Sequence, residues 1–376
     1  MEAIPVNPSD PINTAILSVA EDRIEGFHRK PFHSIAGQSG VKVNTVIERL
    51  SAMMEAGVVR RVRQTLLATK LAQGALVAWD VPEDKIEAAF EWLRDNDPFT
   101  GHVVLRTTDP SNPGHEYRLW TTLKVPTGSN TLEAHCSLLQ KIVGARDFVL
   151  LPAKGIFSLG VGHIRRRGLQ PGDKRPQPAT MTTTASVALS DQEWKVLLVL
   201  KEQLTPEEMI ENPWEGRASM LGMDTKTFFR IAEELDRKKV IGRFATFLEH
   251  VQTKAQDGPV TRFNGLFHWA VPESMEQQAG SECGRHICMT HCYWRTGGNP
   301  FGKAQIMGVV HGLEQDAVLA HKEAIDEHLK ACGIPILHTA VFWGLRSEIK
   351  PSEISPIVYN RWLEQMQGFD VDQISC

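Results

Sequence analysis

The sequence contains no stretch of about 18 consecutive apolar residues, the length that a membrane-spanning helix needs. Its first residues, MEAIPVNPSDP, have neither the basic start nor the apolar core of an export signal. With 42% hydrophobic and 23% charged residues, the composition is that of an ordinary folded protein. We therefore expect a cytoplasmic protein with no membrane contact.

Cysteine is scarce, and a surplus of positive charge is absent. The 376 residues include six cysteines, which without an export signal are expected to be reduced thiols rather than a disulfide framework. The formal net charge is −4, whereas a dedicated DNA-binding protein usually carries a basic surplus that neutralises phosphates. The charge balance therefore weighs against DNA binding as the main activity.

A chain of this length should form two or three domains, and the sequence repeats itself. Residues 31–62 predict a short helix, a turn around Gly40, a second helix over 43–55 and a strand, which is the order of a winged helix-turn-helix. A second copy is predicted at residues 214–248, where Asp224 is the expected N-cap of the second helix.

Each helix-turn-helix unit precedes a second repeated pattern. Strand-like and helix-like periodicities follow one another in the order βαββαβ, once from residue 74 and again from residue 265. This order predicts an α+β fold, a tandem duplication of a winged helix-turn-helix plus a ferredoxin-like sandwich. The predicted domains are winged helix-turn-helix 1 (1–68), ferredoxin-like domain 1 (69–161), a linker (162–188), winged helix-turn-helix 2 (189–250), ferredoxin-like domain 2 (251–349) and a C-terminal tail (350–376).

The linker and the tail have distinct compositions. The linker is rich in Arg, Pro and Thr and is expected to be exposed. Its three consecutive arginines, residues 165–167, either contact nucleic acid or an anionic ligand, or form solvated surface, which is the usual case. Residues 357–366 of the tail have the pattern of an amphipathic helix, a candidate clasp at an interface.

Polar side chains gather on two strands of the second sandwich. Because alternate side chains along a strand share a face, His291, Tyr293 and Arg295 are expected to point the same way. His311 on the next strand is expected to join them. Arginine can hold a carboxylate through two hydrogen bonds and histidine can donate a proton near neutral pH, so this set suits an anionic substrate with several carboxylates. The face of His291 also includes Met289, and the opposite face comprises Cys288, Thr290, Cys292 and Trp294.

The first half carries a partial copy of this pattern. His102 and Arg106 have the spacing of the histidine and arginine described above, but Val104 stands where the second half has tyrosine, and Lys124 stands where it has the second histidine. Lysine can pair with a carboxylate, but its higher pKa makes it a poorer proton donor at neutral pH. The halves have therefore diverged, and we expect one to be catalytic and the other to bind substrate or complete the site.

A winged helix followed by a βαββαβ domain resembles the Lrp/AsnC family of bacterial regulators. Within that superfamily, four segments look like motifs of the siroheme decarboxylases, which occur as paired or fused paralogous subunits in the alternative haem and haem d1 pathways. The resemblance covers about residues 10–350, and the duplication matches the fused form. The segments are LVAWDVPED (76–84), FHWAVPES (267–274), THCYWR (290–295) and MGVVHG (307–312).

The resemblance implies a carboxy-lyase that removes acetate carboxyl groups of siroheme as carbon dioxide, to give 12,18-didecarboxysiroheme, in haem or haem d1 biosynthesis. No further cofactor would be required, because the macrocycle takes up the bond-breaking electrons. Iron would enter only as part of a siroheme or haem-like substrate. The expected catalytic proton donors are His291 and His311. An alternative role for His102 is that of an iron ligand. The expected substrate-binding residues are Arg295, Tyr293, Arg106, His102 and Lys124.

The second functional hypothesis is an Lrp/AsnC-type transcription regulator that senses a tetrapyrrole or another small ligand. However, the second helix of each helix-turn-helix unit offers few of the Arg, Lys, Asn and Gln side chains that contact bases, which favours a scaffold or dimerisation role. Nucleic acid stays an open partner. An internal pseudodimer is expected, with a further homodimer as an alternative.

The cysteines of the second half raise the question of a metal. Cys283, Cys288 and Cys292 lie close in sequence with two histidines between them, as in some zinc or iron–sulfur sites. Residues four apart on a strand are roughly 13 Å apart, too far to chelate one ion. We therefore predict no metal site and expect these thiols to be buried in an apolar core. For any single strand histidine or arginine, a purely structural role is the alternative.

Overall fold

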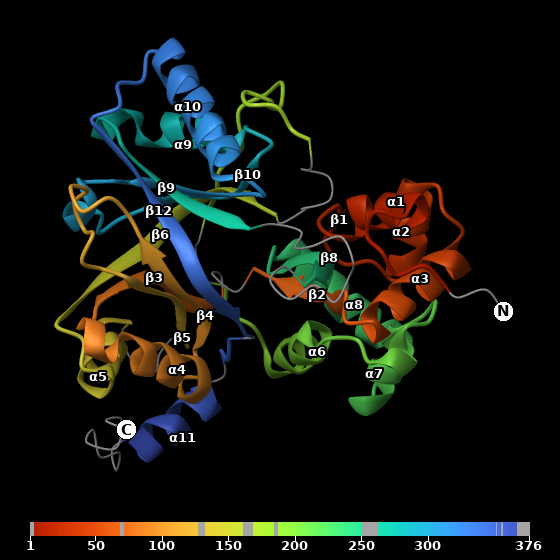
Figure 1. Ribbon diagram of the computed structural model, residues 1–376. Coiled ribbons are helices and arrows are strands. Elements are labelled where there is room, and N and C mark those ends of the chain that lie inside the picture. Colours follow the sequence, from red (N-terminus) through yellow and green to blue (C-terminus); the bar gives the residue numbers. More distant parts are fainter. Residues whose placement is uncertain are drawn as a thin grey trace. The chain divides into compact units, whose positions relative to one another are not determined.

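The computed structural model describes residues 4–67, 71–126, 132–160, 168–183, 187–249, 262–350, 352–354 and 356–366. They form two compact units (Figure 1). Unit 1 comprises residues 1–67, 160–168 and 187–262, and unit 2 comprises residues 68–159, 169–186 and 263–376. Each unit therefore combines corresponding segments from both halves of the chain. No helix within the described ranges has both the length and the apolar content needed to cross a bilayer.

Unit 1 contains the two predicted helix-turn-helix regions. The two halves are joined in one three-stranded sheet, in which β8 pairs with β2 on one side and β1 (Ile24–Glu25) on the other. The first half contributes α1 (Pro11–Ala20), α2 (Pro31–Ser39), α3 (Val43–Glu55) and β2 (Val59–Leu66). The second half contributes α6 (Asp191–Lys201), α7 (Trp214–Met220), α8 (Thr225–Arg237) and β8 (Ile241–Leu248).

Local sequence signals set the helix ends in unit 1. Helix α3 covers the residues predicted for it. Asp224 is the N-cap of α8, as predicted, because its side chain accepts a hydrogen bond from the Thr227 amide. The two halves also share a core, since the rings of Phe32 and Phe244 meet edge to face with centroids 5.5 Å apart. Unit 1 is therefore a single body.

Unit 2 is built on eight long strands. Within each half the strand order is that of a ferredoxin-like βαββαβ sheet: β4-β5-β3-β6 and β10-β11-β9-β12. The strands of the first half are β3 (Ala72–Asp80), β4 (Thr100–Thr107), β5 (Leu119–Pro126) and β6 (Asp147–Leu159). Those of the second half are β9 (Phe263–Ala270), β10 (Met289–Arg295), β11 (Ile306–Gly312) and β12 (His338–Ile349).

The expectation of two separate sandwiches is wrong. Strand β12 pairs with β4, and β10 pairs with β6, so that both edges of one sheet are hydrogen-bonded to both edges of the other and the eight strands close into an antiparallel barrel. A short ninth strand, β7 (Thr182–Thr183), adds to β6. The physical reason is that each βαββαβ sheet leaves two edges with unpaired amides and carbonyls, and the two copies satisfy one another's edges.

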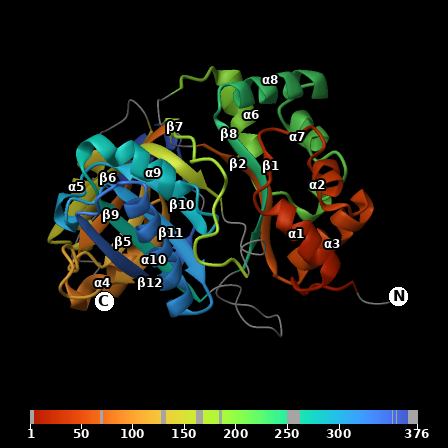
Figure 2. The same cartoon turned by 90° about the horizontal axis from the view of Figure 1, so that it is seen from above.

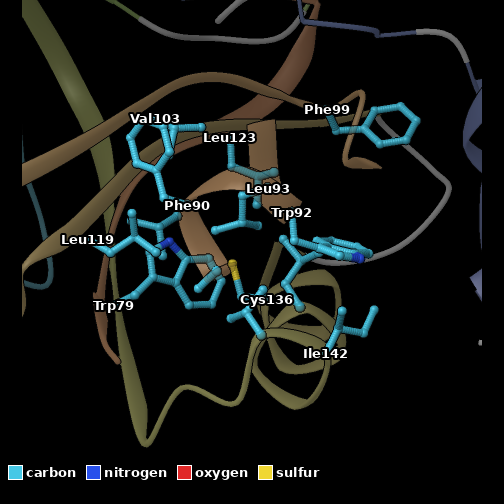
Figure 3. Packing of buried hydrophobic residues seen from close by; sticks show 14 of the residues in the cluster. Trp79, Phe90, Trp92, Leu93, Phe99, Val103, Leu119, Leu123, Cys136 and Ile142 are labelled. Carbon is cyan, nitrogen blue, oxygen red and sulfur yellow. The ribbon is translucent and has the colours of Figure 1, made fainter. Parts of the chain in front are cut away.

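Helices cover the outside of the barrel (Figures 1 and 2). In the first half α4 (Ile86–Asn96) and α5 (Leu132–Val143) enclose an apolar core that includes Trp79, Phe90 and Leu119 (Figure 3). In the second half α9 (Glu276–Gly284) and α10 (Gln315–Ala331) cover a corresponding core. Short 3-10 helices occur at η2 (Glu83–Lys85), η3 (Pro206–Glu208), η4 (Glu273–Met275) and η5 (Asn299–Phe301).

The amphipathic helix predicted in the tail is α11 (Pro356–Met366). It packs within unit 2 on the core of the first half, where the Trp362 indole donates to the carbonyl of Asn96 and the Tyr359 hydroxyl lies 3.0 Å from Nδ1 of His135. The tail therefore fastens onto its own chain. The arginine run at residues 165–167 lies outside the described residues.

Candidate functional site

A third apolar cluster lies inside the barrel. It draws on inward-facing residues of seven strands and on the two connecting segments that carry Tyr117 and Phe301. Trp120, Phe301 and Phe342 form its aromatic centre. Its buried members are Ala78, Val104, Tyr117, Trp120, Val149, Leu151, Leu266, Phe301, Ala304, Met307, Ala340 and Phe342. Part of the barrel is therefore a packed core rather than a channel.

The predicted site residues share the inward faces of these strands. In β4, the side chains of His102 and Arg106 alternate with the outward ones and so lie on the face of Val104. Lys124 takes the face of Trp120 in β5 by the same rule. In β10, Tyr293 is directly opposite the inward-facing Met307. All seven candidates follow this alternation, so the structure gathers them on the inner surface of one barrel. The seven are His102, Arg106, Lys124, His291, Tyr293, Arg295 and His311.

A chain of hydrogen bonds joins three of these residues. The Arg106 guanidinium donates to Oδ1 of Asn264 at 3.3 Å, and Nδ2 of Asn264 lies 3.2 Å from Nε2 of His311. On the far side of that ring, Nδ1 lies 3.4 Å from the Thr290 hydroxyl oxygen, which is also 3.2 Å from Nδ1 of His291. The chain runs from an arginine of the first half to both histidines of the second.

The donors and acceptors in this chain fix the protonation pattern of the two rings. The Asn264 amide donates to Nε2 of His311, which must then accept. The Thr290 hydroxyl donates to the Val309 carbonyl at 2.9 Å, so its oxygen accepts from Nδ1–H of each imidazole. Each neutral histidine is thereby held with its proton on Nδ1 and its lone pair on Nε2.

Thr290 was expected on the outward face, and that expectation is wrong. The pairing of β10 with β11 shifts register between Met289 and His291, as in a β-bulge. The bulge directs the Thr290 hydroxyl to both imidazoles, and it places Met289 in the outer core rather than beside His291. Thr290 could not be recognised as part of the site from simple alternation, whereas Asn264 lies on the face of Leu266 and so follows the alternation.

Arg295 and Tyr293 form a second group on β10. The guanidinium lies 4.3 Å from the centre of the Tyr293 ring, a cation–π contact, and donates to the Leu151 carbonyl at 2.6 Å. The Tyr293 ring in turn lies nearly parallel to the His291 ring, with centroids 6.3 Å apart. The three side chains predicted to converge on this strand do so.

Arg106 and Arg295 are both buried, with 5% and 8% of their surface exposed. Arg106 donates to the Phe342 carbonyl of the second half, and Arg295 to the Leu151 carbonyl of the first. No carboxylate of the described residues forms an ion pair with either guanidinium, and the Nε of each has no hydrogen-bond partner there. Burial lowers the pKa of each to about 10. Since a buried charge is costly unless it is paired, two such groups favour binding of an anion.

The remaining two candidates lie together in the first half. Nε2 of His102 is 2.7 Å from the Ser347 hydroxyl of β12. His102 is opposite Thr122 in the β4–β5 pairing, and Lys124 is the next inward residue after Thr122. Both are half-buried.

His268 is a site residue that the sequence did not single out, although it lies within the FHWAVPES motif. Its ring stacks on Phe342 with centroids 4.6 Å apart, and among the described residues neither ring nitrogen has a hydrogen-bond partner. Burial, followed by the nearby charge of Arg106, lowers the pKa of His268 to about 3. The imidazole is therefore neutral at physiological pH. The sequence did offer one signal: His268 is two residues after Leu266, so alternation places both side chains on the same face of the strand.

A neutral buried histidine makes stability depend on pH. On unfolding, the His268 ring returns to a pKa near 6.5 and takes up a proton below that pH, whereas the folded ring does so only near pH 3. The free energy of unfolding should therefore fall by up to about 1.4 kcal/mol per pH unit as pH drops from about 6.5 towards 3. Urea unfolding at pH 7, 6 and 5 should show a shallower fall for His268→Phe than for the wild type. Equal slopes would contradict this account.

Three cysteines of the second half are buried, as predicted. Cys283, Cys288 and Cys292 are reduced thiols buried in the core between the sheet and its helices. Burial raises the pKa of Cys283 and of Cys292, so neither is a reactive thiolate.

Comparisons with known proteins show which proteins this chain is similar to. The model of the AsnC-like ligand binding domain matches residues 71–158. The siroheme decarboxylase of Hydrogenobacter thermophilus is 23% identical over 340 residues, covering 90% of this chain and 93% of that protein. The siroheme decarboxylase beta subunit of Methanosarcina barkeri is 26% identical over 143 residues, covering 38% of this chain and 90% of the subunit.

Two solved structures are similar to this chain in fold. The crystal structure of the siroheme decarboxylase NirDL superposes with a TM-score of 0.66 at 18% identity, covering 95% of this chain and 100% of that one. The same enzyme in complex with an iron-uroporphyrin III analogue gives a TM-score of 0.65, again at 18% identity, with 95% and 99% covered. The Lrp/AsnC-like α+β fold is thereby confirmed, as is the family resemblance inferred from the sequence motifs.

Proposed function

Because this chain is a homologue of the siroheme decarboxylases along nearly its whole length, we propose that it is a decarboxylase that removes acetate carboxyl groups from siroheme to give 12,18-didecarboxysiroheme. The observation that carries the proposal is the pair of buried guanidiniums inside the barrel, neither paired with a carboxylate of the described residues. Anionic groups of a substrate would supply the missing charge. The crystallised relative that binds an iron-uroporphyrin III analogue supports a tetrapyrrole as that substrate.

The proposed chemistry needs one proton for each carboxylate lost. The C–C bond to the carboxylate breaks, carbon dioxide leaves, and the electron pair of the bond passes into the macrocycle. The methylene carbon then takes up a proton and becomes a methyl group. Imidazoles at His291 and His311 are suited to deliver it, because histidine changes charge near neutral pH. No further cofactor is proposed, and iron enters with the substrate.

The side chains around the histidines have positioning roles in this scheme. Arg106 and Arg295 would each hold a substrate carboxylate through a bidentate pair of hydrogen bonds. The Thr290 hydroxyl holds the Nδ1 side of both imidazoles, and Nε2 would take up and release the catalytic proton. At His311 the Asn264 amide is bonded to Nε2 and would have to turn away before that nitrogen takes up a proton. Tyr293, His102 and Lys124 line the same inner surface and would contact the remaining polar groups of the macrocycle.

Incubation of the purified full chain with siroheme under anaerobic conditions tests the proposal. The tetrapyrrole product should be lighter by two carbon dioxide molecules, as measured by mass spectrometry of the extracted pigment. A heat-unfolded sample serves as the control for spontaneous decarboxylation. No mass change, together with salt-sensitive binding of the protein to its own promoter DNA, would favour the regulator instead.

The helices of unit 1 support a scaffold role rather than DNA reading. Arg49 of α3 is held by Asp10 at 3.2 Å and also donates to Asn13, so this basic side chain is engaged within the unit. On α8, Glu233 binds Arg29. We propose that residues 1–68 and 189–250 are two winged helix-turn-helix units retained as scaffold, that the chain is an internal pseudodimer, and that it works in the cytoplasm.

A further inference from the structure

Three potential metal ligands meet on the outer side of unit 2, where α9 and α10 cover the sheet. Nε2 of His328 lies 2.6 Å from Oε2 of Glu282 and 3.6 Å from Sγ of Cys332. One carboxylate oxygen, one imidazole nitrogen and one sulfur lie within 4.8 Å of one another. Glu282 belongs to α9, while His328 lies in α10 and Cys332 caps its C-terminus.

A fourth potential ligand, His286, lies beside these three. It follows Glu282 by four residues and lies just beyond the end of α9, whereas His328 and Cys332 are four residues apart at the end of α10. The His286 ring is 1% exposed, and its centroid lies 5.1 Å from that of His328. Among the described residues neither nitrogen of His286 has a hydrogen-bond partner. Because buried polar atoms are nearly always bonded, this ring lacks a ligand that the protein itself does not supply.

We infer that Glu282, His286, His328 and Cys332 form a binding site for a zinc-class divalent cation. The site lies outside the barrel and is separate from the proposed decarboxylase site. Imidazole, thiolate and carboxylate are the three ligand types that zinc takes in proteins. Two residues at or just beyond the end of each of the two neighbouring helices would supply the four ligands of a closed structural site.

One spacing in the site already agrees with tetrahedral coordination. Bond lengths of about 2.0–2.3 Å place neighbouring ligand atoms of a tetrahedral zinc site about 3.3–3.6 Å apart. The separation of 3.6 Å between Nε2 of His328 and Sγ of Cys332 already meets this value. The 2.6 Å contact between His328 and Glu282 is a hydrogen bond, and the cation would replace its proton and lengthen it.

Two positively charged side chains, Lys174 and Arg285, border the site. The first can move into solvent, and the second has further hydrogen-bond partners. Lys174 lies 2.9 Å from Nδ1 of His328, and its side chain is exposed and can swing into solvent. Arg285 binds Oε2 of Glu282 but also donates to the carbonyls of Arg175 and Pro176. Arg285 can therefore stay in place through those carbonyls while Glu282 turns towards a metal.

The position of the site suggests its effect. Two main-chain hydrogen bonds tie the segment of Asp173 and Arg175 to the residues after α9, from Arg175 N to Arg285 O and from Ile287 N to Asp173 O. A cation held by both helices would fasten α9 to α10 over the core behind β10, the strand of His291. Its role would be structural.

Metal content of the tag-free full chain tests the inference. After incubation with excess Zn²⁺ and gel filtration, about one zinc per chain is expected by elemental analysis. With Co²⁺ instead, absorption bands of tetrahedral cobalt with a thiolate ligand are expected. Cys332→Ser and His286→Gln should each lower zinc affinity by at least tenfold. His321→Gln, on the same helix but seven residues before His328, or about 10 Å along the axis, should bind like the wild type.

Several outcomes would overturn the inference. Less than one zinc per ten wild-type chains would do so, as would cobalt spectra without a thiolate band. Unchanged affinity in Cys332→Ser or in His286→Gln would remove that residue as a ligand and with it the four-ligand site. Circular dichroism of each variant checks that it is folded, and the cobalt spectrum of the wild type decides the question if a variant is not. None of these measurements depends on decarboxylase activity.

Discussion

Replacement of His291 or of His311 by alanine is expected to lower the rate of siroheme decarboxylation by about 10²- to 10⁴-fold. Each imidazole carries its proton on Nδ1 towards Thr290 and would exchange the catalytic proton at Nε2, which at His311 requires the Asn264 amide to turn away. Removal of either imidazole should therefore break the supply of protons to the substrate carbon. The measurement is a single-turnover rate with siroheme under anaerobic conditions, followed by mass spectrometry. Binding of siroheme should change far less than the rate.

The matched control is His115→Ala, because His115 is an exposed histidine at the protein surface. That variant should turn over at the wild-type rate. If both His291→Ala and His311→Ala keep rates within twofold of the wild type, the assignment of the proton donors is wrong, even though the fold would stand. A large loss in only one variant would identify that histidine as the donor and leave the other a positioning role.

Replacement of Arg106 or Arg295 by methionine is expected to weaken siroheme binding by about 10- to 100-fold. A hydrogen-bonded ion pair of a guanidinium with a carboxylate is worth roughly 1.5–3 kcal/mol, and each buried arginine has no such partner among the described residues before substrate binds. Methionine fills a similar volume without the charge. Spectroscopic titration of the protein with siroheme gives the dissociation constant.

Protein stability provides a second readout for these variants. Since methionine removes a buried charge, the free energy of unfolding without substrate should stay the same or rise. Arg295→Lys should bind with intermediate affinity, because lysine keeps the charge but not the planar fork. Arg361→Met, at an exposed position on α11, should bind normally. Loss of stability with unchanged binding would mean that the buried arginines are structural.

Much of the barrel's inner surface could be predicted from the sequence, because a strand shows a period of two whatever its partners are. Alternation placed His291, Tyr293 and Arg295 on one face, and the spacing of His102 and Arg106 identified the corresponding strand of the first half. The duplication was also visible, since both copies keep the same order of periodicities.

Features that depend on contacts between distant segments could not be predicted. Closure of the barrel depends on which strand edges meet, and no local pattern specifies that β4 pairs with β12. The bulge that directs Thr290 to the imidazoles breaks the alternation on which the prediction relied. Asn264 and His268 belong to the site but lie on β9, whose sequence has no motif of paired charges that would single it out.

The two cross-half pairings, β4 with β12 and β6 with β10, mean that neither half can complete the ring of strands by itself. Where the equivalent halves are separate polypeptides, such a ring forms only if two molecules collide, and it falls apart on dilution. Here both halves belong to one polypeptide. The effective concentration of one half around the other is therefore set by the connecting segment rather than by the amount of protein made. Ring assembly thereby becomes a first-order event, and both halves are always produced in equal number.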